Sequence, residues 1–490
     1  MARAHASLRT LFALLVAAVV VGSAVRAAWI SGAQLRQRTD LLLESTQLAS
    51  VLVLQRGQDL YGPETWADVP FTLTMYTPLY FLVVAALPQT PGRPFLTGRL
   101  VSLACLLGAA ATLFGVPRRR GAWPLPLLAV ACFLLLWPVT SHATYLRCDA
   151  LAVFLSAAAV TLVRRRTPRA VAGAALCCVL TLATKQSYVA PSAAGLVFLL
   201  LADRGAARRF VAWGLGAGLA GLAAATAVWG EGFWFSTVGA TTTPLHWPGV
   251  LVIPKLMLDQ PLFAILTLLA ALTAVSALRR EGVGLLRRSP ELTYAACSFL
   301  VAMLTLTKIG SGSNYVIEPM LAQLMWLVRA FGDERLLPAP APRAAAFLAV
   351  VLACALELAT TTAHRDAVTF ALEDPAAGEA YHARLRAGFA AAGYVDPLLL
   401  DLGPPRHAYG ITSRACLNDP FLFNLLWNTG RLGTGPLLEA IEARRFDVVL
   451  LRAAASEADA LDTPYGEIAR AVAARYRLRG QDAEHRYFVR

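Results

Sequence analysis

Two acids that could do chemistry follow the first long apolar run of the chain. Asp40 and Glu44 are four residues apart, so on a helix they share one face. Together they could deprotonate a hydroxyl group or hold a divalent ion, and burial would raise the pKa of one of them toward the range of a general base. An ordinary helix start with Asp40 as the N-cap residue explains the same pattern, and both interpretations stay open.

A second group of residues has the chemistry of a phosphate site. Arg147 and Asp149 are separated by one residue, a spacing in which the arginine can bind a phosphate and the aspartate can orient it. Lys185 and Gln186 lie between two apolar runs. Arginine is the usual cation of this chain, so a lysine here suits a phosphate oxygen as a compact point charge. An interfacial ion pair and a snorkelling lysine are the alternatives.

A third group lies in the segment KIGSGSNYVIE, which runs from Lys308 to Glu318. Its glycines and serines can bring backbone N–H groups close to a ligand. Asn314 and Tyr315 then lead into the next apolar run together with Glu318. A glutamate at a helix N-terminus is electrostatically favoured in any protein, but an acid this close to hydrocarbon is also a site candidate.

The composition shows what must position these residues. The chain has 490 residues, of which 57% are hydrophobic and only 15% are charged, whereas about a quarter are charged in a typical soluble domain. Repeated apolar runs predict a mainly α, polytopic helical membrane protein with about 11 spans, 10 to 13 being possible. The expected spans are residues 9–30, 97–116, 123–140, 148–163, 169–184, 188–203, 208–229, 255–278, 291–307, 316–332 and 343–360.

The placement of the arginines predicts the orientation. The net charge of +13 is concentrated in short loops on one side, which is the positive-inside pattern and not a nucleic-acid-binding face. We therefore expect a multi-pass protein of a bacterial-type inner membrane with a cytoplasmic N-terminus. All the candidate residues then lie on the outer side. Residues 77–88 are apolar but too short to cross, and we expect a half-buried or re-entrant helix there.

The chain is expected to divide into a transmembrane domain, residues 1–360, and an extracytoplasmic soluble α/β domain, residues 361–490. Residues 31–80 form the first outer loop and the expected catalytic loop of the first domain. Strand–helix–strand order in the second domain predicts a small, partly parallel sheet. The expected elements are strands at 397–402 and 446–451, an edge strand at 485–490, and helices at 366–391 (broken at Pro375), 420–427, 436–444 and 465–476.

The ordered motifs over roughly residues 1–335 resemble the GT-C superfamily of polytopic glycosyltransferases. The branch they resemble includes protein O-mannosyltransferases, aminoarabinose transferases and rhizobial galacturonosyltransferase-like proteins. The C-terminal region matches more loosely, through LNDPF and FDVVLL. The motifs that carry the resemblance are the acids of the first loop, GQDLY (57–61), YTPLY (76–80), RCD (147–149), TKQS (184–187) and GSNYVIEP (312–319).

The resemblance implies an inverting transfer of a sugar from a polyprenyl-phosphate donor to a lipid, glycan or protein acceptor at the outer face of the membrane. Asp40 or Glu44 would be the base. The implied phosphate-binding residues are Arg147, Lys185 and Lys308, and the implied substrate-binding residues are Tyr76, Asp149, Gln186, Asn314, Tyr315 and Glu318. No resident cofactor is implied, and the need for a divalent metal stays open.

The main alternative from another class is a polytopic lipid or glycan transporter without transferase activity. Such a protein should show inverted repeats and polar residues at mid-membrane. The sequence has no evident repeat, and the candidate residues gather at one face. The expected partners are therefore the lipid-linked donor, the acceptor and membrane lipids, with no nucleic acid.

Overall fold

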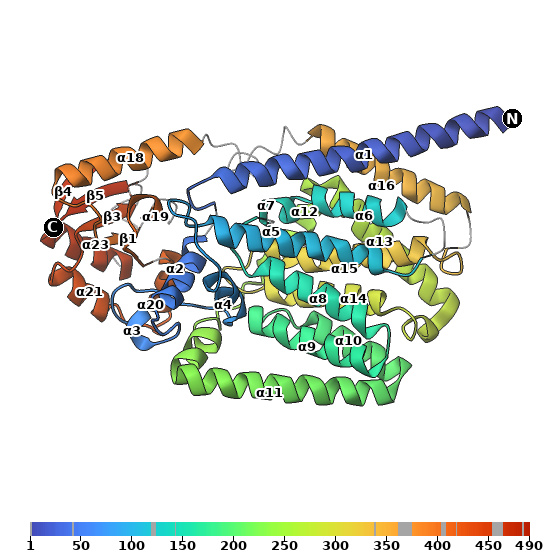
Figure 1. The fold of residues 1–490 in the computed structure, drawn as a ribbon, viewed down its shortest axis with the longest axis horizontal. Coiled ribbons are helices and arrows are strands. Elements are labelled where there is room, and N and C mark those ends of the chain that lie inside the picture. Colours follow the sequence, from blue (N-terminus) through green and yellow to red (C-terminus); the bar gives the residue numbers. More distant parts are fainter. Residues whose placement is uncertain are drawn as a thin grey trace.

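The computed structural model describes residues 2–41, 44–118, 124–142, 144–337, 340–360, 375–402, 408–417, 419–452, 464–482 and 485–490. Figure 1 shows a bundle of long, roughly parallel helices with a small sheet at one end. The C-terminus lies at the sheet end, and the N-terminus lies at the opposite end of the bundle.

Helices form where apolar runs were expected. Apolar side chains face lipid or neighbouring helices, and the backbone satisfies its own hydrogen bonds. The helices at the eleven expected spans are α1 (Ala2–Arg36), α5 (Leu96–Ala111), α6 (Pro124–Leu135), α8 (Asp149–Val163), α9 (Pro168–Thr184), α10 (Ala190–Ala202), α11 (Arg204–Trp234), α13 (Pro261–Glu281), α14 (Pro290–Leu306), α15 (Ile317–Phe331) and α16 (Pro340–Thr360).

The bundle is that of a polytopic helical membrane protein. Among the described residues, five segments are long and apolar enough to cross a membrane by length and composition. These are Ala13–Arg36, Leu96–Gly115, Arg204–Gly239, Pro261–Leu285 and Arg343–Thr360. Five shorter apolar helices accompany them: α6, α8, α9, α10 and α14. The exact number of spans stays a prediction.

Short elements join the long helices. They are α2 (Glu44–Gln55), α3 (Pro63–Trp66), α4 (Leu79–Ala85), α7 (Trp137–His142) and α12 (Val252–Asp259), with the 3-10 turns η1 (Thr112–Gly115), η3 (Trp247–Leu251), η4 (Gly282–Leu285) and η5 (Ser313–Val316) and the π turn η2 (Phe235–Gly239). Segment 77–88 contains α4, whose 7 residues are too few to cross a bilayer. It packs against α2.

The basic loops gather at the end of the bundle that lies away from the sheet. Arg164 donates to the carbonyl oxygen of Gly115 at 2.6 Å, and Arg166 donates to that of Arg287 at 2.5 Å. Loops far apart in the sequence are therefore in contact, as expected from the concentration of positive charge in short loops on one side. Arg119 and Arg120 lie outside the described residues.

The C-terminal region contains a five-stranded mixed sheet in the order β2-β1-β3-β5-β4. Its strands are β1 (Leu399–Asp401), β2 (Ala415–Cys416), β3 (Val448–Arg452), β4 (Arg477–Gln481) and β5 (His485–Val489). β1 pairs in parallel with β2 and β3, whereas β5 is antiparallel to both β3 and β4. The partly parallel sheet is confirmed. The prediction that 485–490 is an edge strand is wrong, because β4 covers that side of β5.

In the described segments of this region, five helices accompany the strands: α18 (Pro375–Ala391), α19 (Ala408–Ile411), α20 (Pro420–Asn428), α21 (Gly435–Glu442) and α23 (Pro464–Arg475). Proline stands within the first two helical residues of α20 and α21, where its missing N–H costs nothing. Residues 361–374, which hold the start of the predicted 366–391 helix and the predicted domain boundary, lie outside the described residues.

The first outer loop is the platform on which the C-terminal region packs. Phe71 belongs to the same buried apolar cluster as Leu422 and Phe446. The Leu417 N–H donates to the carbonyl oxygen of Pro70 at 2.9 Å. Figure 1 accordingly places α2, α3 and α4 between the bundle and the sheet. The length of this loop therefore has a packing reason as well as a predicted chemical one.

Candidate active site

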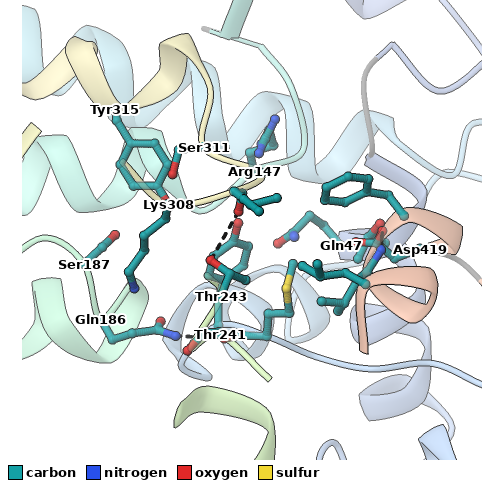
Figure 2. A pocket seen from close by; sticks show the side chains of 18 residues that line it. Gln47, Arg147, Gln186, Ser187, Thr241, Thr243, Lys308, Ser311, Tyr315 and Asp419 are labelled. Carbon is teal, nitrogen blue, oxygen red and sulfur yellow. Dashed lines mark hydrogen bonds between the residues drawn. The ribbon is translucent and has the colours of Figure 1, made fainter. Parts of the chain in front are cut away.

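A cavity of about 210 Å³ lies where the bundle, the first outer loop and the C-terminal region meet. Residues from α2, the loops of the bundle and α20 form its wall, and Figure 2 shows their side chains. The lining residues are Thr46, Gln47, Met75, Tyr76, Arg147, Gln186, Ser187, Thr241, Thr243, Lys308, Ile309, Gly310, Ser311, Tyr315, Asp419, Phe421, Leu422 and Leu425.

The cavity wall has two cationic side chains, Arg147 and Lys308. Arg147 is held from behind, since its Nε lies 3.6 Å from Oδ2 of Asp149. Lys308 starts a short loop that turns at Gly310, where φ is +86°, a conformation that glycine adopts without strain. Both cations were predicted to bind phosphate, and both have access to the cavity.

Behind this wall lies a buried cluster centred on Asp149. Its Oδ1 accepts hydrogen bonds from Lys185 Nζ at 2.7 Å, from Asn314 Nδ2 at 2.9 Å and from the Tyr188 hydroxyl at 3.0 Å. The sequence placed Lys185, Asp149 and Asn314 on the same outer side as site candidates, and the tertiary structure brings them into direct contact. A buried carboxylate with this many charged and polar partners is well compensated.

Lys185 faces this cluster and not the cavity. It is 1% exposed, and its Nζ lies 4.9 Å from the ring centre of Tyr76 and 4.4 Å from that of Tyr315. Both rings line the cavity. In this structure the lysine fixes the two tyrosines from behind, through cation–π contacts. Its predicted direct contact with the donor phosphate stays a prediction.

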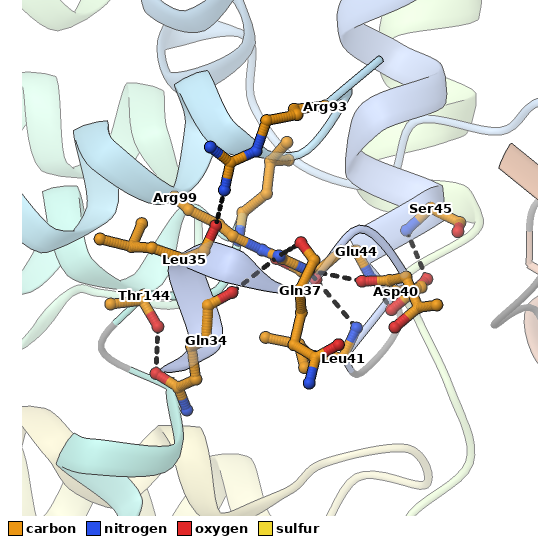
Figure 3. A network of polar contacts seen from close by, with 12 residues as sticks. Gln34, Leu35, Gln37, Asp40, Leu41, Glu44, Ser45, Arg93, Arg99 and Thr144 are labelled. Carbon is orange, nitrogen blue, oxygen red and sulfur yellow. Dashed lines mark hydrogen bonds and ion pairs between the residues drawn. The ribbon is translucent and has the colours of Figure 1, made fainter. Parts of the chain in front are cut away.

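Glu44 is fully enclosed by hydrogen-bond donors. Arg99, from α5, donates through Nε to Glu44 Oε1 at 2.9 Å and through Nη2 to Oε2. The N–H groups of Leu146 and Leu41 add bonds of 2.7 Å and 2.9 Å to the same two oxygens. Figure 3 shows this network, in which Arg99 also binds the backbone that precedes Asp40. Glu44 thus joins three segments of chain, and its predicted role as a base stays untested.

Asp40 caps the N-terminus of α2. Its two oxygens accept hydrogen bonds from the N–H groups of Glu44 and Ser45, at 2.9 Å and 2.7 Å. Burial and the neighbouring charge of Glu44 raise the pKa of Asp40 to about 6. The carboxylate does not line the cavity, but α2 continues directly into Thr46 and Gln47, which do. The N-cap interpretation from the sequence therefore describes the observed contacts.

Two further predicted site residues differ in their access to the cavity. Gln186 lines the cavity, and its Nε2 donates to the carbonyl oxygens of Met75 and Thr237 at 2.9 Å and 3.0 Å. Glu318 is 4% exposed and accepts from the Tyr294 hydroxyl at 3.1 Å, without reaching the cavity wall. The predicted substrate role of Glu318 has no support from its position.

Sequence reasoning missed a carboxylate in the wall, Asp419. It caps α20 by accepting from the Leu422 N–H at 2.9 Å, and burial raises its pKa to about 6. It is the only Asp or Glu among the lining residues of the described cavity. Asp419 belongs to the LNDPF motif of the looser C-terminal resemblance, but nothing in the sequence indicated that this helix end meets the bundle. Gln47 was missed for the same reason.

No group of three or more His, Cys, Asp and Glu side chains that could hold a metal ion occurs within the described parts of the chain. The pair Asp40 and Glu44, the predicted alternative for a divalent ion, is instead engaged with Arg99 and with backbone N–H groups. Whether the reaction needs a metal stays open.

Comparison with known proteins identifies the fold. No family model matches the sequence, and no curated protein matches it either. Among solved structures, ArnT from Cupriavidus metallidurans in the apo state aligns with a TM-score of 0.59 at 12% identity, covering 98% of each chain. The chain has the fold of ArnT. The structure of ArnT bound to undecaprenyl phosphate aligns with a TM-score of 0.58, with the same identity and coverage.

The agreement with ArnT extends over both parts of the chain, because the alignment covers nearly all of it. The mainly helical, polytopic fold with a small C-terminal α/β region that the sequence predicts is thereby confirmed as an ArnT-like fold. At 12% identity the agreement concerns the fold alone.

Proposed function

We propose that this protein is a membrane glycosyltransferase that moves a sugar from a polyprenyl-phosphate-linked donor to a lipid, glycan or protein acceptor. The observation that carries the proposal is the cavity, where Arg147 and Lys308 face one space together with tyrosine, serine and threonine side chains. Cations suit a lipid-linked phosphate, and hydroxyl and aromatic groups suit a sugar. That ArnT binds undecaprenyl phosphate in a solved structure supports this class of donor.

The cations would stabilise the phosphate as it leaves. When the bond between the sugar and the phosphate breaks, negative charge grows on the departing lipid phosphate. Arg147 is preorganised for that charge, because Asp149 fixes its guanidinium and Asp149 is itself fixed by Lys185. Preorganised charges of this kind are usually the largest single contribution to catalysis.

The proposed base is Asp40 rather than Glu44. Both oxygens of Glu44 are engaged by Arg99 and by backbone N–H groups, so this carboxylate is not free to bind an acceptor hydroxyl. Asp40 accepts from the backbone N–H groups of Glu44 and Ser45 and from the Ser45 side chain, none of which is a cation. Its pKa of about 6 suits a group that exchanges protons near neutral pH. As the base, it would accept the proton of the acceptor hydroxyl while that oxygen attacks the sugar.

The proposed orientation rests on the placement of the arginine-rich loops. The arginine-rich loops lie at one end of the bundle, and the cavity lies at the other end beside the C-terminal region. By the positive-inside rule, the cavity would open to the extracytoplasmic side of the membrane. The reaction would then use a donor that has already been carried to that side.

The decisive experiment measures lipid-linked sugar turnover in membranes that contain the wild type, Asp40→Asn, Glu44→Gln or Lys308→Ala. Turnover by the wild type with loss in Asp40→Asn and Lys308→Ala is the expected result. Lys255→Ala is the matched control, since Lys255 lies in α12 and does not line the cavity. Equal behaviour of all variants over a panel of polyprenyl-phosphate sugars would reject the proposal and make lipid transport the next hypothesis.

A further inference from the structure

The cavity is chemically polarised. Lys308 lies on one side, while Asp419 and Gln47 lie together on the opposite side, as Figure 2 shows. The first side offers hydrogen-bond donors with positive charge. The second offers two acceptors, the Asp419 carboxylate and the Gln47 amide oxygen, which is unpartnered in the described part of the chain. A ligand that fits both sides has an anionic end and an end rich in hydrogen-bond donors.

The side-chain oxygen of Gln47, in this wall, has no hydrogen-bond partner among the described residues. The residue is 4% exposed. Buried polar atoms in proteins nearly always have a partner. A buried amide that lines a cavity without one is therefore ready to bind a group that enters the cavity.

One oxygen of the Asp419 carboxylate is occupied by the helix cap. Its Oδ1 accepts from the Leu422 N–H at 2.9 Å, which fixes the carboxylate at the start of α20 while it lines the cavity. Phe421 lies next to it and reaches across to the opposite loop, since a Cβ atom placed on Gly310 would lie 3.1 Å from the Phe421 ring. The C-terminal region therefore supplies both an acceptor and an aromatic face to the cavity.

We propose that Asp419 and Gln47 form the subsite that binds the hydroxyl groups of the donor sugar, while Arg147 and Lys308 hold its phosphate. This inference rests on the proposed function and adds the recognition of the sugar. Phosphate and sugar are covalently joined, so a donor whose phosphate lies against the cations must place its sugar in the remaining space. Asp419 is then a specificity-determining residue, and the C-terminal region takes part in substrate selection.

The subsite predicts a preference that binding can measure without turnover. The full-length wild type should bind undecaprenyl phosphate carrying its preferred pentose or hexose more tightly than it binds undecaprenyl phosphate alone. In Asp419→Asn this preference should fall by about ten- to a hundredfold, the range expected for a lost hydrogen bond to a charged group. Binding of undecaprenyl phosphate alone should change little. Gln47→Leu should act in the same direction and less strongly.

The variants separate a binding role from a structural one. Asparagine caps helices as well as aspartate does, so Asp419→Asn keeps the start of α20. Asp203→Asn is the matched control, because Asp203 caps α11 through the Ala206 N–H and does not line the cavity. Lys308→Ala should weaken the binding of both lipids by the same factor and leave the preference for the sugar-linked lipid intact.

Two outcomes would contradict the inference. An unchanged preference in Asp419→Asn would overturn it, whether binding of both lipids stays as in the wild type or weakens equally. A wild type that prefers no sugar-linked lipid over the bare lipid would also overturn it. By contrast, a wild type that shows the preference but transfers no sugar would reject the transferase proposal and leave the sugar subsite standing.

Discussion

Arg99 and Glu44 form a two-point ion pair that neither solvent nor lipid reaches. Both side chains are 0% exposed, and the arginine also donates to the carbonyl oxygens of Gln34 and Gln37, at 2.9 Å and 2.5 Å. One residue of α5 thereby fixes the end of α1 and the start of α2. The first outer loop, which was expected to carry the chemistry, is held in place by this pair.

Breaking the pair should destabilise the protein strongly. Removal of one partner leaves the other charge buried and uncompensated, which costs about 3–5 kcal/mol. Arg99→Ala and Glu44→Gln should therefore lower the midpoint of thermal unfolding in detergent micelles. Asp68→Ala is the control, since Asp68 pairs with Arg445 at the surface, with side chains 52% and 45% exposed, and exposed pairs contribute about 0–1 kcal/mol. A stable but inactive Glu44→Gln would instead identify Glu44 as the base.

Transfer should depend on pH through Asp40. Its pKa is raised to about 6, and a base acts only when deprotonated, so the rate should rise as the pH increases through 6 and then level off. The raised pKa also means that this group favours the folded state below pH 4 and loses that contribution as the pH rises through 6. A pH–rate profile of the wild type tests whether the rate rises through pH 6 in this way. Substantial residual transfer in Asp40→Asn, with the same rise in rate, would exclude this residue as the base.

The buried cluster behind the cavity should matter more for stability than for phosphate binding. Lys185→Ala leaves Asp149 without its closest partner at 2.7 Å, and the expected loss is again about 3–5 kcal/mol. The double variant Asp149→Asn with Lys185→Met removes both charges and should recover part of the loss. Thermal unfolding measures this. If Lys185→Ala instead keeps its stability and loses affinity for undecaprenyl phosphate, the sequence-based prediction of a phosphate ligand would be supported.

Affinity for undecaprenyl phosphate should depend on the two cations of the cavity wall. Lys308→Ala and Arg147→Gln should each weaken binding by roughly tenfold or more, because charge-assisted hydrogen bonds to phosphate are among the stronger ones. Lys255→Ala should bind as the wild type does. Equilibrium binding to the purified protein tests this. Equal affinities for all four proteins would show that the phosphate does not bind at Lys308 and Arg147.

The preference for a sugar-linked lipid should weaken in acid. The pKa of Asp419 is raised to about 6 by burial, although Arg147 and the Leu422 N–H oppose the shift. Below pH 6 the carboxylate gains a proton and becomes a poorer acceptor. Lysine and arginine side chains keep their charge between pH 5 and 8, so the facing cations cannot produce the same change. Measuring the affinity for undecaprenyl phosphate with and without the sugar, at pH 5 and 7.5, checks this. In Asp419→Asn the preference should not change with pH.

Much of the fold was determined locally by the sequence. Apolar runs of about 16–24 residues satisfy their own backbone hydrogen bonds only as helices, and a helix occurs at each expected span. The strand at 446–451 was evident for a similar reason, as a short run of β-branched and apolar residues, and it became β3. The position of β5 inside the sheet was not predictable, because strand order depends on pairing between distant segments.

The sequence alone determined only part of the candidate site. The residue types around Arg147, Lys185 and Lys308 indicated a phosphate site, and sequence spacing placed them on one side of the membrane. Which of them face the cavity was decided by the tertiary structure: Lys185 turns to Asp149, Glu44 to Arg99, and Lys308 to the cavity. Asp419 and Gln47 joined the wall only because the C-terminal region packs on the first outer loop. A sequence lists charges, but burial and pairing, which arise from contacts between distant segments, decide which of those charges remain available to a ligand.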